Sequence, residues 1–165
     1  MAATLRYADE TLRVVTDRRL CVIRWLDSPG ARHFAEVTRA FAYAVDKSGK
    51  GGVGLFNVVD ARGKLPRFND EIRRAAGDMT RAVTPDSAGA AHVILVDGLA
   101  GVAVRMFLST LTLLSRAATP TTIHSSLAEG AAWLGHVLAA NPSAAQIEAA
   151  YALTLQVERR APTPP

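Results

Sequence analysis

The chain has 165 residues, of which 49% are hydrophobic and 21% charged, and its formal net charge is +4. This length suits one domain with a core of its own, and the apolar content excludes a disordered chain. The longest apolar run, Leu99–Leu114, contains Arg105 and is shorter than the roughly 18–20 residues of a membrane helix. The N-terminus lacks the apolar stretch of a secretory signal, and the lone Cys21 cannot form an internal disulfide. We therefore expect a cytoplasmic domain without a membrane span.

The positive charge is spread along the whole chain instead of forming one basic segment. Of the 19 basic residues, 16 are arginines, and aromatic residues make up only 6% of the chain. Proteins that bind nucleic acid usually gather basic side chains on one face, together with aromatic rings that stack on bases. We therefore expect solvated surface charge and no nucleic-acid partner.

The first half of the chain predicts a hairpin followed by alternating helices and strands. Two runs of β-forming residues, Thr11–Thr16 and Leu20–Leu26, are separated by a short polar turn. A helix start at Ser28-Pro29-Gly30 precedes an apolar stripe at helical spacing that ends at Ser48-Gly49. Its members are Phe34, Val37, Phe41 and Val45. Residues 53–59 form an apolar strand, typical of one covered on both faces.

The second half continues the alternation. Asn69 is expected to cap a helix whose apolar stripe is Ile72, Ala76, Met79 and Val83. An apolar strand follows at His92–Val96. The helix Leu99–Arg116 is apolar around most of its circumference, which predicts that it is well buried. Then come a short strand at Thr121–His124 and two helices, each opened by a capping box: Ser126 with Glu129, and Ser143 with Gln146. The first of these helices carries Trp133, which we expect to anchor it to the sheet.

Strands that alternate with helices of this length pair in parallel through right-handed crossovers. The predicted fold class is therefore α/β, with a mainly parallel sheet, an N-terminal antiparallel hairpin and flanking helices. No linker is visible, so residues 1–142 and an appended helix at 143–160 form one domain, and 161–165 form a disordered tail. The appended helix has apolar residues on more than one side. It is either a partner or dimer surface or packs on its own sheet.

Three stretches give this order of elements a resemblance to a known family. They are the hairpin and helix LRVVTDRRLCVIRWLDSPGARHFAEVTRAF, the strands GLFNVVD and HVILVD, and the closing TTIHSSLAEGAAWLGHVL. Together they make residues 10–140 similar to the SpoIIAA-like proteins of the STAS superfold, relatives of bacterial anti-sigma-factor antagonists. The resemblance implies a non-enzymatic regulatory or protein-interaction module with a protein partner.

The resemblance does not extend to the family's phosphorylation switch. Anti-sigma antagonists carry a serine in the turn after a central strand, and the matching turn here begins at Asp60. No serine or threonine occurs between Asp60 and Met79. The phosphorylation chemistry of that family therefore cannot be carried over to this chain.

A glycine-rich string, Lys50-Gly51-Gly52-Val53-Gly54, mimics part of a phosphate-binding loop. Such a loop needs a second lysine and a hydroxyl residue, but Leu55 and Phe56 stand at those positions. It also precedes a strand, whereas a phosphate loop follows one. We therefore interpret it as a turn and expect no nucleotide cofactor.

The loops that follow the predicted strands form the candidate site. In open α/β sheets, ligands gather beyond the carboxyl ends of the strands. The polar residues there, a candidate site for a ligand or partner, are Asp60, Arg62, Lys64, Arg67, Asp97 and Arg105. Arg105 lies on an apolar helix and needs a partner, for which Asp60 or Asp97 is expected. The alternative function is therefore a small-molecule or lipid-binding domain that uses these loops.

The histidines do not indicate a metal or catalytic site. His33, His92, His124 and His136 lie on four different predicted elements, without the spacing of metal ligands. No nucleophile turn is present from which a Ser–His–Asp triad could be built. We therefore expect ordinary hydrogen-bonded histidines, no catalytic residues, no metal and no cofactor.

Overall fold

The structure, a computed structural model, describes residues 2–49, 52–61, 66–115 and 119–156. Within them a single sheet has the strand order β1-β2-β3-β4-β5-β6, which is also the order along the chain. The first three strands are antiparallel neighbours, and β3 to β6 are parallel. The strands are β1 (Thr4–Ala8), β2 (Leu12–Asp17), β3 (Leu20–Trp25), β4 (Val53–Val59), β5 (Ser87–Ile94) and β6 (Thr121–His124).

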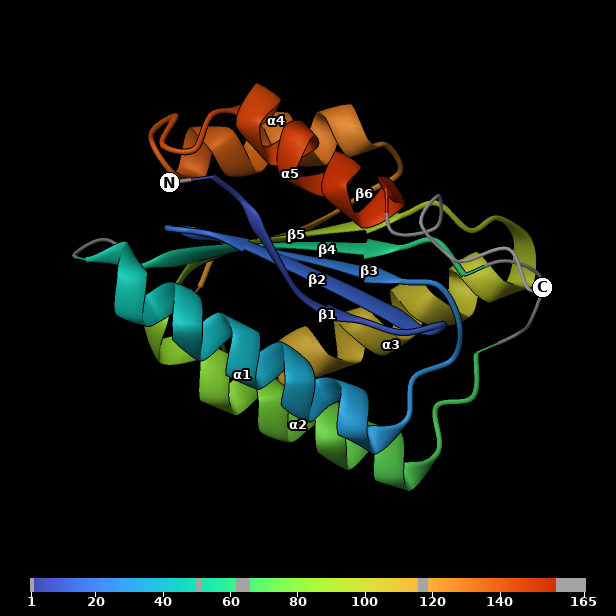
Figure 1. Cartoon of the computed structure of the whole chain (residues 1–165). Helices are drawn as coiled ribbons and strands as arrows, with labels where there is room; N and C mark the ends of the chain where they lie inside the picture. Colours follow the sequence, from blue (N-terminus) through green and yellow to red (C-terminus); the bar gives the residue numbers. More distant parts are fainter. Residues whose placement is uncertain (1, 50–51, 62–65, 116–118, 157–165) are drawn as a thin grey trace, which may run out of the picture.

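Helices cover both faces of the sheet (Figure 1). The five α-helices of the described residues are α1 (Ala31–Ser48), α2 (Asp70–Val83), α3 (Gly98–Ser115), α4 (Leu127–Val137) and α5 (Ala144–Gln156), and a short 3₁₀ turn spans Thr84–Asp86. The first three helices connect consecutive parallel strands and lie on one face, while α4 and α5 lie on the other. Crossovers of one hand between strands added in one direction produce this segregation. The predicted α/β class with a mixed sheet is confirmed.

Two apolar cores result, one on each face of the sheet. The core under α1, α2 and α3 includes Ile23, Leu55 and Val37. The core under α4 and α5 includes Val22, Phe56 and Leu134. Because alternate residues of a strand point to opposite faces, β3 and β4 supply buried side chains to both layers. Their continuous apolar sequence is explained by this double coverage.

The predicted helix starts after the hairpin are largely confirmed by their hydrogen bonds. The Asn69 side chain accepts a bond from the Ile72 amide, and Ser126 accepts one from Glu129. Ser143 and Gln146 bond to each other's backbone amides, as a capping box requires. At α1 the prediction is displaced by two residues, because Gly30, not Ser28, is the N-cap.

Two predictions about strands need correction. The strand β1 was not anticipated, because its side chains are mostly exposed and its sequence lacks an apolar run. The strand expected at His92–Val96 instead spans Ser87–Ile94. Its first half consists of small residues that pair with β4 from Val53 onward, and this pairing extends the strand toward the amino end.

The prediction that the third helix is well buried is wrong. Its outer side exposes a row of apolar side chains, and their exposed fractions lie between 53% and 82%. We call this row the outer α3 face; it consists of Leu99, Val102, Met106 and Leu113. The inner side, with Val104 and Leu108, is buried against the first core. The helix is therefore apolar on two sides but covered on only one.

The last helix packs on its own sheet, as the second of its two predicted alternatives required. Ile147, Ala150, Tyr151 and Thr154 are buried, and α5 lies against β2, β3 and α4. Trp133 packs against the second core and lies beside His124 of β6, but it is only partly buried, so it anchors α4 less completely than expected. Ala131, Leu134 and Leu138 of this segment are fully buried in the second core.

No helix of the described residues is long and apolar enough to cross a membrane.

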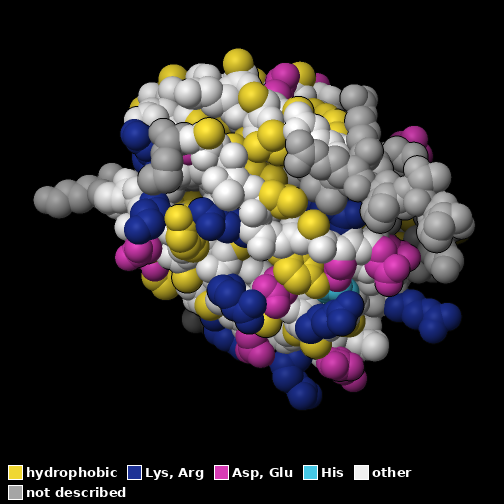
Figure 2. All heavy atoms as spheres, viewed as in Figure 1, with side chains coloured by type: hydrophobic (Ala, Val, Ile, Leu, Met, Phe, Trp, Pro, Cys, Tyr) yellow, Lys and Arg dark blue, Asp and Glu magenta, His cyan; other side chains and the backbone are white. Residues whose placement is uncertain are grey.

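On the face seen in Figure 2, basic and acidic side chains alternate over the region of α1, with apolar side chains between them. This face therefore carries charge of both signs and is not a uniformly basic surface.

Candidate functional site

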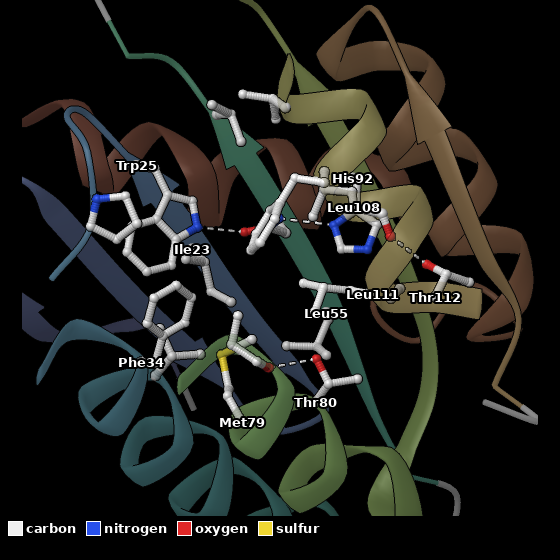
Figure 3. Close-up of a pocket in the computed structure, with 18 of the residues that line it drawn as sticks. Ile23, Trp25, Phe34, Leu55, Met79, Thr80, His92, Leu108, Leu111 and Thr112 are labelled. Atoms are coloured by element: carbon white, nitrogen blue, oxygen red, sulfur yellow. Dashed lines mark hydrogen bonds between the residues drawn. The ribbon is translucent and has the colours of Figure 1, made fainter. Parts of the chain in front are cut away.

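A cavity lies between the sheet and the helices α1, α2 and α3, and we call it the inner pocket (Figure 3). Its volume is about 130 Å³. Ile23 and Leu55 of the sheet and Leu108 of α3 supply part of its apolar wall. Phe68, from the segment before α2, stacks on Phe107 of α3 with ring centroids 4.0 Å apart, and both line the pocket. An apolar cavity of this kind is the usual form of a small-molecule site.

A row of three polar side chains crosses the sheet wall of the inner pocket. The indole Nε1 of Trp25 donates a hydrogen bond to Oδ1 of Asn57 over 2.8 Å. The amide Nδ2 of Asn57 lies 2.9 Å from Nδ1 of His92. These residues come from β3, β4 and β5, and Asn57 pairs directly with His92 in the parallel register. We call this row the polar relay; Figure 3 shows its two hydrogen bonds as dashed lines.

The environment of His92 keeps its ring neutral. Burial lowers the pKa of His92 from its ordinary 6.5 to about 4, because the charged imidazolium is poorly solvated in the pocket wall. At neutral pH the ring therefore carries one proton, either on Nδ1 or on Nε2. Such a ring can donate one hydrogen bond and accept another.

Threonine side chains also line the inner pocket, on the side of the helices. The hydroxyl of Thr80 donates to the carbonyl oxygen of Ala76 over 2.8 Å. That of Thr112 donates to the carbonyl oxygen of Leu108 over 2.9 Å. Both hydroxyl protons are thus directed to the backbone of their own helices. The other polar residues that line the pocket are Asp27, Thr84, Ser87, Thr119 and Thr121.

The residues predicted from the sequence as a strand-end site have other partners. Asp60 accepts a hydrogen bond from Nη2 of Arg24 over 2.6 Å. Arg105 donates to the hydroxyl of Ser125 over 3.2 Å. Among the described residues there is no ion pair between Arg105 and Asp60 or Asp97, so the expected pairing is wrong. The physical reason for the different pairing is that the Asp60 carboxylate is already bound by Arg24, which is fully buried on β3.

The remaining members of that predicted site are peripheral or undescribed. Arg67 and Asp97 are exposed, and Arg62 and Lys64 lie outside the described residues. The same loop does contribute to the inner pocket, but through Ala61, Pro66 and Phe68. The strand-end loop therefore reaches the cavity with apolar side chains, whereas the site residues predicted in it from the sequence are its charged ones.

The polar relay is not among the site residues predicted from the sequence. Asn57 was included in a strand described as apolar, and His92 was interpreted as an ordinary histidine. One signal was available: a buried asparagine in an otherwise apolar strand is costly unless it finds hydrogen-bond partners. Those partners lie 32 residues before it and 35 residues after it, so only the strand register brings them together.

The other chemical motifs lead to no second site. His33 bonds to Asp9 and to the Gly30 amide, and His124 bonds to Thr122. In the part of the chain that the structure describes, no group of three or more His, Cys, Asp or Glu side chains could hold a metal ion. The glycine-rich string enters β4, as expected, although Lys50 and Gly51 themselves lie outside the described residues.

Comparison with known proteins gives no relative from which a function could be transferred. No protein-family model, curated protein or solved structure matches this chain.

Proposed function

We propose that this protein is a non-enzymatic binding module that holds a small apolar ligand in the inner pocket. The observation that carries the proposal is the pocket itself: a mostly apolar cavity with a row of linked polar groups in its sheet wall. Ligand sites typically combine apolar walls with a few polar groups that orient the ligand. A small-molecule ligand is the alternative that the sequence predicted, but the ligand lies between the sheet and the helices α1, α2 and α3 and not in the strand-end loops.

The volume of the inner pocket limits the size of the ligand. An engineered apolar cavity of about 150 Å³ in another protein stays dry and binds benzene. A volume of about 130 Å³ therefore suits a molecule of five to seven heavy atoms, without displacement of the helices. This favours a single small ring or a short branched chain over a long-chain lipid.

The chemistry of His92 supports binding and argues against acid–base catalysis. A general base works best when its pKa lies near the working pH. An imidazole with a pKa of about 4 is a weak base at neutral pH, and as a neutral ring it is suited to hydrogen bonding.

Binding of benzene tests the proposal. We expect benzene to shift the methyl NMR signals of Ile23, Leu55 and Leu108, which line the pocket, and to leave those of Leu134 on the other face unchanged. Thr80→Leu fills part of the cavity and should abolish these shifts. Ala82→Leu, on the exposed side of the same helix, is the matched control and should bind as the unmodified protein does. Benzene-induced shifts spread evenly over both cores would contradict the proposal. The same holds if benzene saturates the methyl shifts of Thr80→Leu as it does those of the unmodified protein.

The second candidate is the regulatory or protein-interaction module that the SpoIIAA-like resemblance implies. The outer α3 face favours it, because contiguous exposed apolar side chains often mark interaction sites. Sedimentation velocity over a hundredfold range of concentration tests whether a second copy is the partner. Val102→Glu combined with Met106→Glu should then abolish association, whereas Ala128→Glu with Ala132→Glu, at two exposed positions of α4 on the other side of the sheet, is the charge-matched control. A monomer at every concentration would exclude a second copy.

A further inference from the structure

The polar relay has a direction, and it starts at Trp25. An indole Nε1 carries a proton and has no lone pair to accept with, so it only donates. Its partner 2.8 Å away must be the oxygen of the Asn57 amide. Trp25 and Asn57 are both buried, so water does not compete for this bond. The amide orientation of Asn57 is therefore determined by chemistry and does not depend on how its two similar atoms were assigned.

The orientation of Asn57 in turn determines the tautomer of His92. With Oδ1 held by the indole, the group that faces His92 is the amide nitrogen Nδ2, which only donates. Nδ1 of His92, 2.9 Å away, must accept this bond and so carries no proton. In a neutral imidazole the single proton then lies on Nε2. Burial keeps the ring neutral, because it lowers the pKa of His92 to about 4.

The Nε2–H group is the open end of the polar relay. The His92 side chain lines the inner pocket and points into it toward Leu108 and Leu111 (Figure 3). Within the described residues, Asn57 is the hydrogen-bond partner of His92, and it occupies the Nδ1 edge of the ring. The other ring nitrogen is therefore left to a molecule in the cavity.

We propose that His92 presents a fixed Nε2–H donor to the inner pocket and selects ligands that carry one hydrogen-bond acceptor, such as a carbonyl oxygen, on a small apolar body. This inference rests on the proposed function, because it names the ligand class of the same pocket. A buried donor without an acceptor is costly, so an acceptor-free ligand of equal shape is disfavoured. A ligand group that only donates would face the imidazole proton and is also disfavoured.

The relay itself is tested without any ligand. We expect long-range ¹H–¹⁵N NMR spectra at pH 7 to show His92 in a single tautomer, protonated at Nε2. Asn57→Leu removes the donor to Nδ1 and should allow both tautomers. His136, exposed on α4, is the internal control and should show the usual mixture in both proteins. A proton on Nδ1 of His92 in the unmodified protein would overturn the inference.

The ligand class is tested with two probes of the same shape. Cyclopentanone carries an exocyclic oxygen, which accepts a hydrogen bond. Methylenecyclopentane carries an exocyclic methylene group at the same position, which does not. Each is titrated into the unmodified protein, His92→Phe and, as a control, His136→Phe. For each protein we take the ratio of the dissociation constants of the two probes. Dividing the ratio for a variant by the ratio for the unmodified protein cancels the difference in hydration between the probes.

We expect His92→Phe to weaken the preference for the ketone about 3- to 10-fold, the usual range for one net hydrogen bond, and His136→Phe to leave it unchanged. If both probes bind and the ratio is the same in His92→Phe, the ligand class is wrong while the pocket proposal survives. If neither probe binds the unmodified protein, the pocket proposal fails and this inference fails with it.

Discussion

Asp60 and Arg24 form an ion pair that joins the carboxyl end of β4 to the interior of the sheet. Asp60 Oδ2 lies 2.6 Å from Nη2 and 3.1 Å from Nε of Arg24, whose side chain is 1% exposed. The same guanidinium donates to the carbonyl oxygen of Thr154 and lies over the ring of Tyr151, both on α5. The guanidinium of Arg24 would be costly to bury alone, and it is stabilised by partners at the end of β4 and on α5.

Removing one member of this pair should cost more than removing both. Asp60→Ala takes a carboxylate from a buried guanidinium and should lower the free energy of unfolding by about 3 kcal/mol. Arg24→Met combined with Asp60→Ala leaves no buried charge and should recover part of that loss. Urea unfolding of the two single variants and the double variant checks this. Strict additivity of the two single effects would show that the pair is not coupled.

The last helix should be required for folding. Ile147 is fully buried in the second core, so Ile147→Ala should lower the free energy of unfolding by about 3 kcal/mol. Glu148→Ala, exposed on the next residue of α5, should change it by less than about 0.5 kcal/mol. Chemical denaturation followed by tryptophan fluorescence measures both. If a chain truncated after Asn141 stays folded, α5 is an accessory helix and this prediction is wrong.

Two helical glycines should respond to alanine in opposite ways. A Cβ on Gly130 would lie 2.5 Å from Cγ2 of the buried Val93, so Gly130→Ala must push α4 away from the sheet. We expect a loss of about 1–3 kcal/mol. A Cβ on Gly77 of α2 would meet nothing closer than 3.7 Å, and Gly77→Ala should stabilise the protein by about 0.5–1 kcal/mol. Thermal unfolding of the pair measures both effects, and a stabilising Gly130→Ala would refute the close contact.

Stability should fall in mild acid because of His92. Burial lowers the pKa of His92 in the folded protein from 6.5 to about 4. Between these values the unfolded chain binds a proton that the folded protein excludes, so stability is complete above pH 6.5 and falls as the pH approaches 4. The full loss from this residue is about 3 kcal/mol. In His92→Phe the free energy of unfolding should vary less across this range, and an unchanged pH dependence would disprove the assignment.

Local patterns determined the elements and their order. The hairpin, the capping residues Asn69 and Ser126, and the strand at 53–59 depend on neighbours within a few residues, so their signals are present in the sequence itself. The same holds for the α/β class, because alternation of strands and helices leaves few parallel arrangements. The missed β1 has exposed side chains and is stabilised by pairing with β2, which no local pattern records.

Contacts between distant residues were decided only by the tertiary structure. From the sequence alone, Arg105 was expected to pair with a carboxylate at the end of a strand. The last helix was expected to be either a partner or dimer surface or to pack on its own sheet. The fold alone placed Arg24 beside Asp60, 36 residues away, and brought Arg24 against α5. The polar relay is of the same kind, since Trp25, Asn57 and His92 meet only because three parallel strands adopt one register. Hydrophobic patterning specifies which face of a strand is buried, whereas the partner of a buried polar group depends on the packing of the whole sheet.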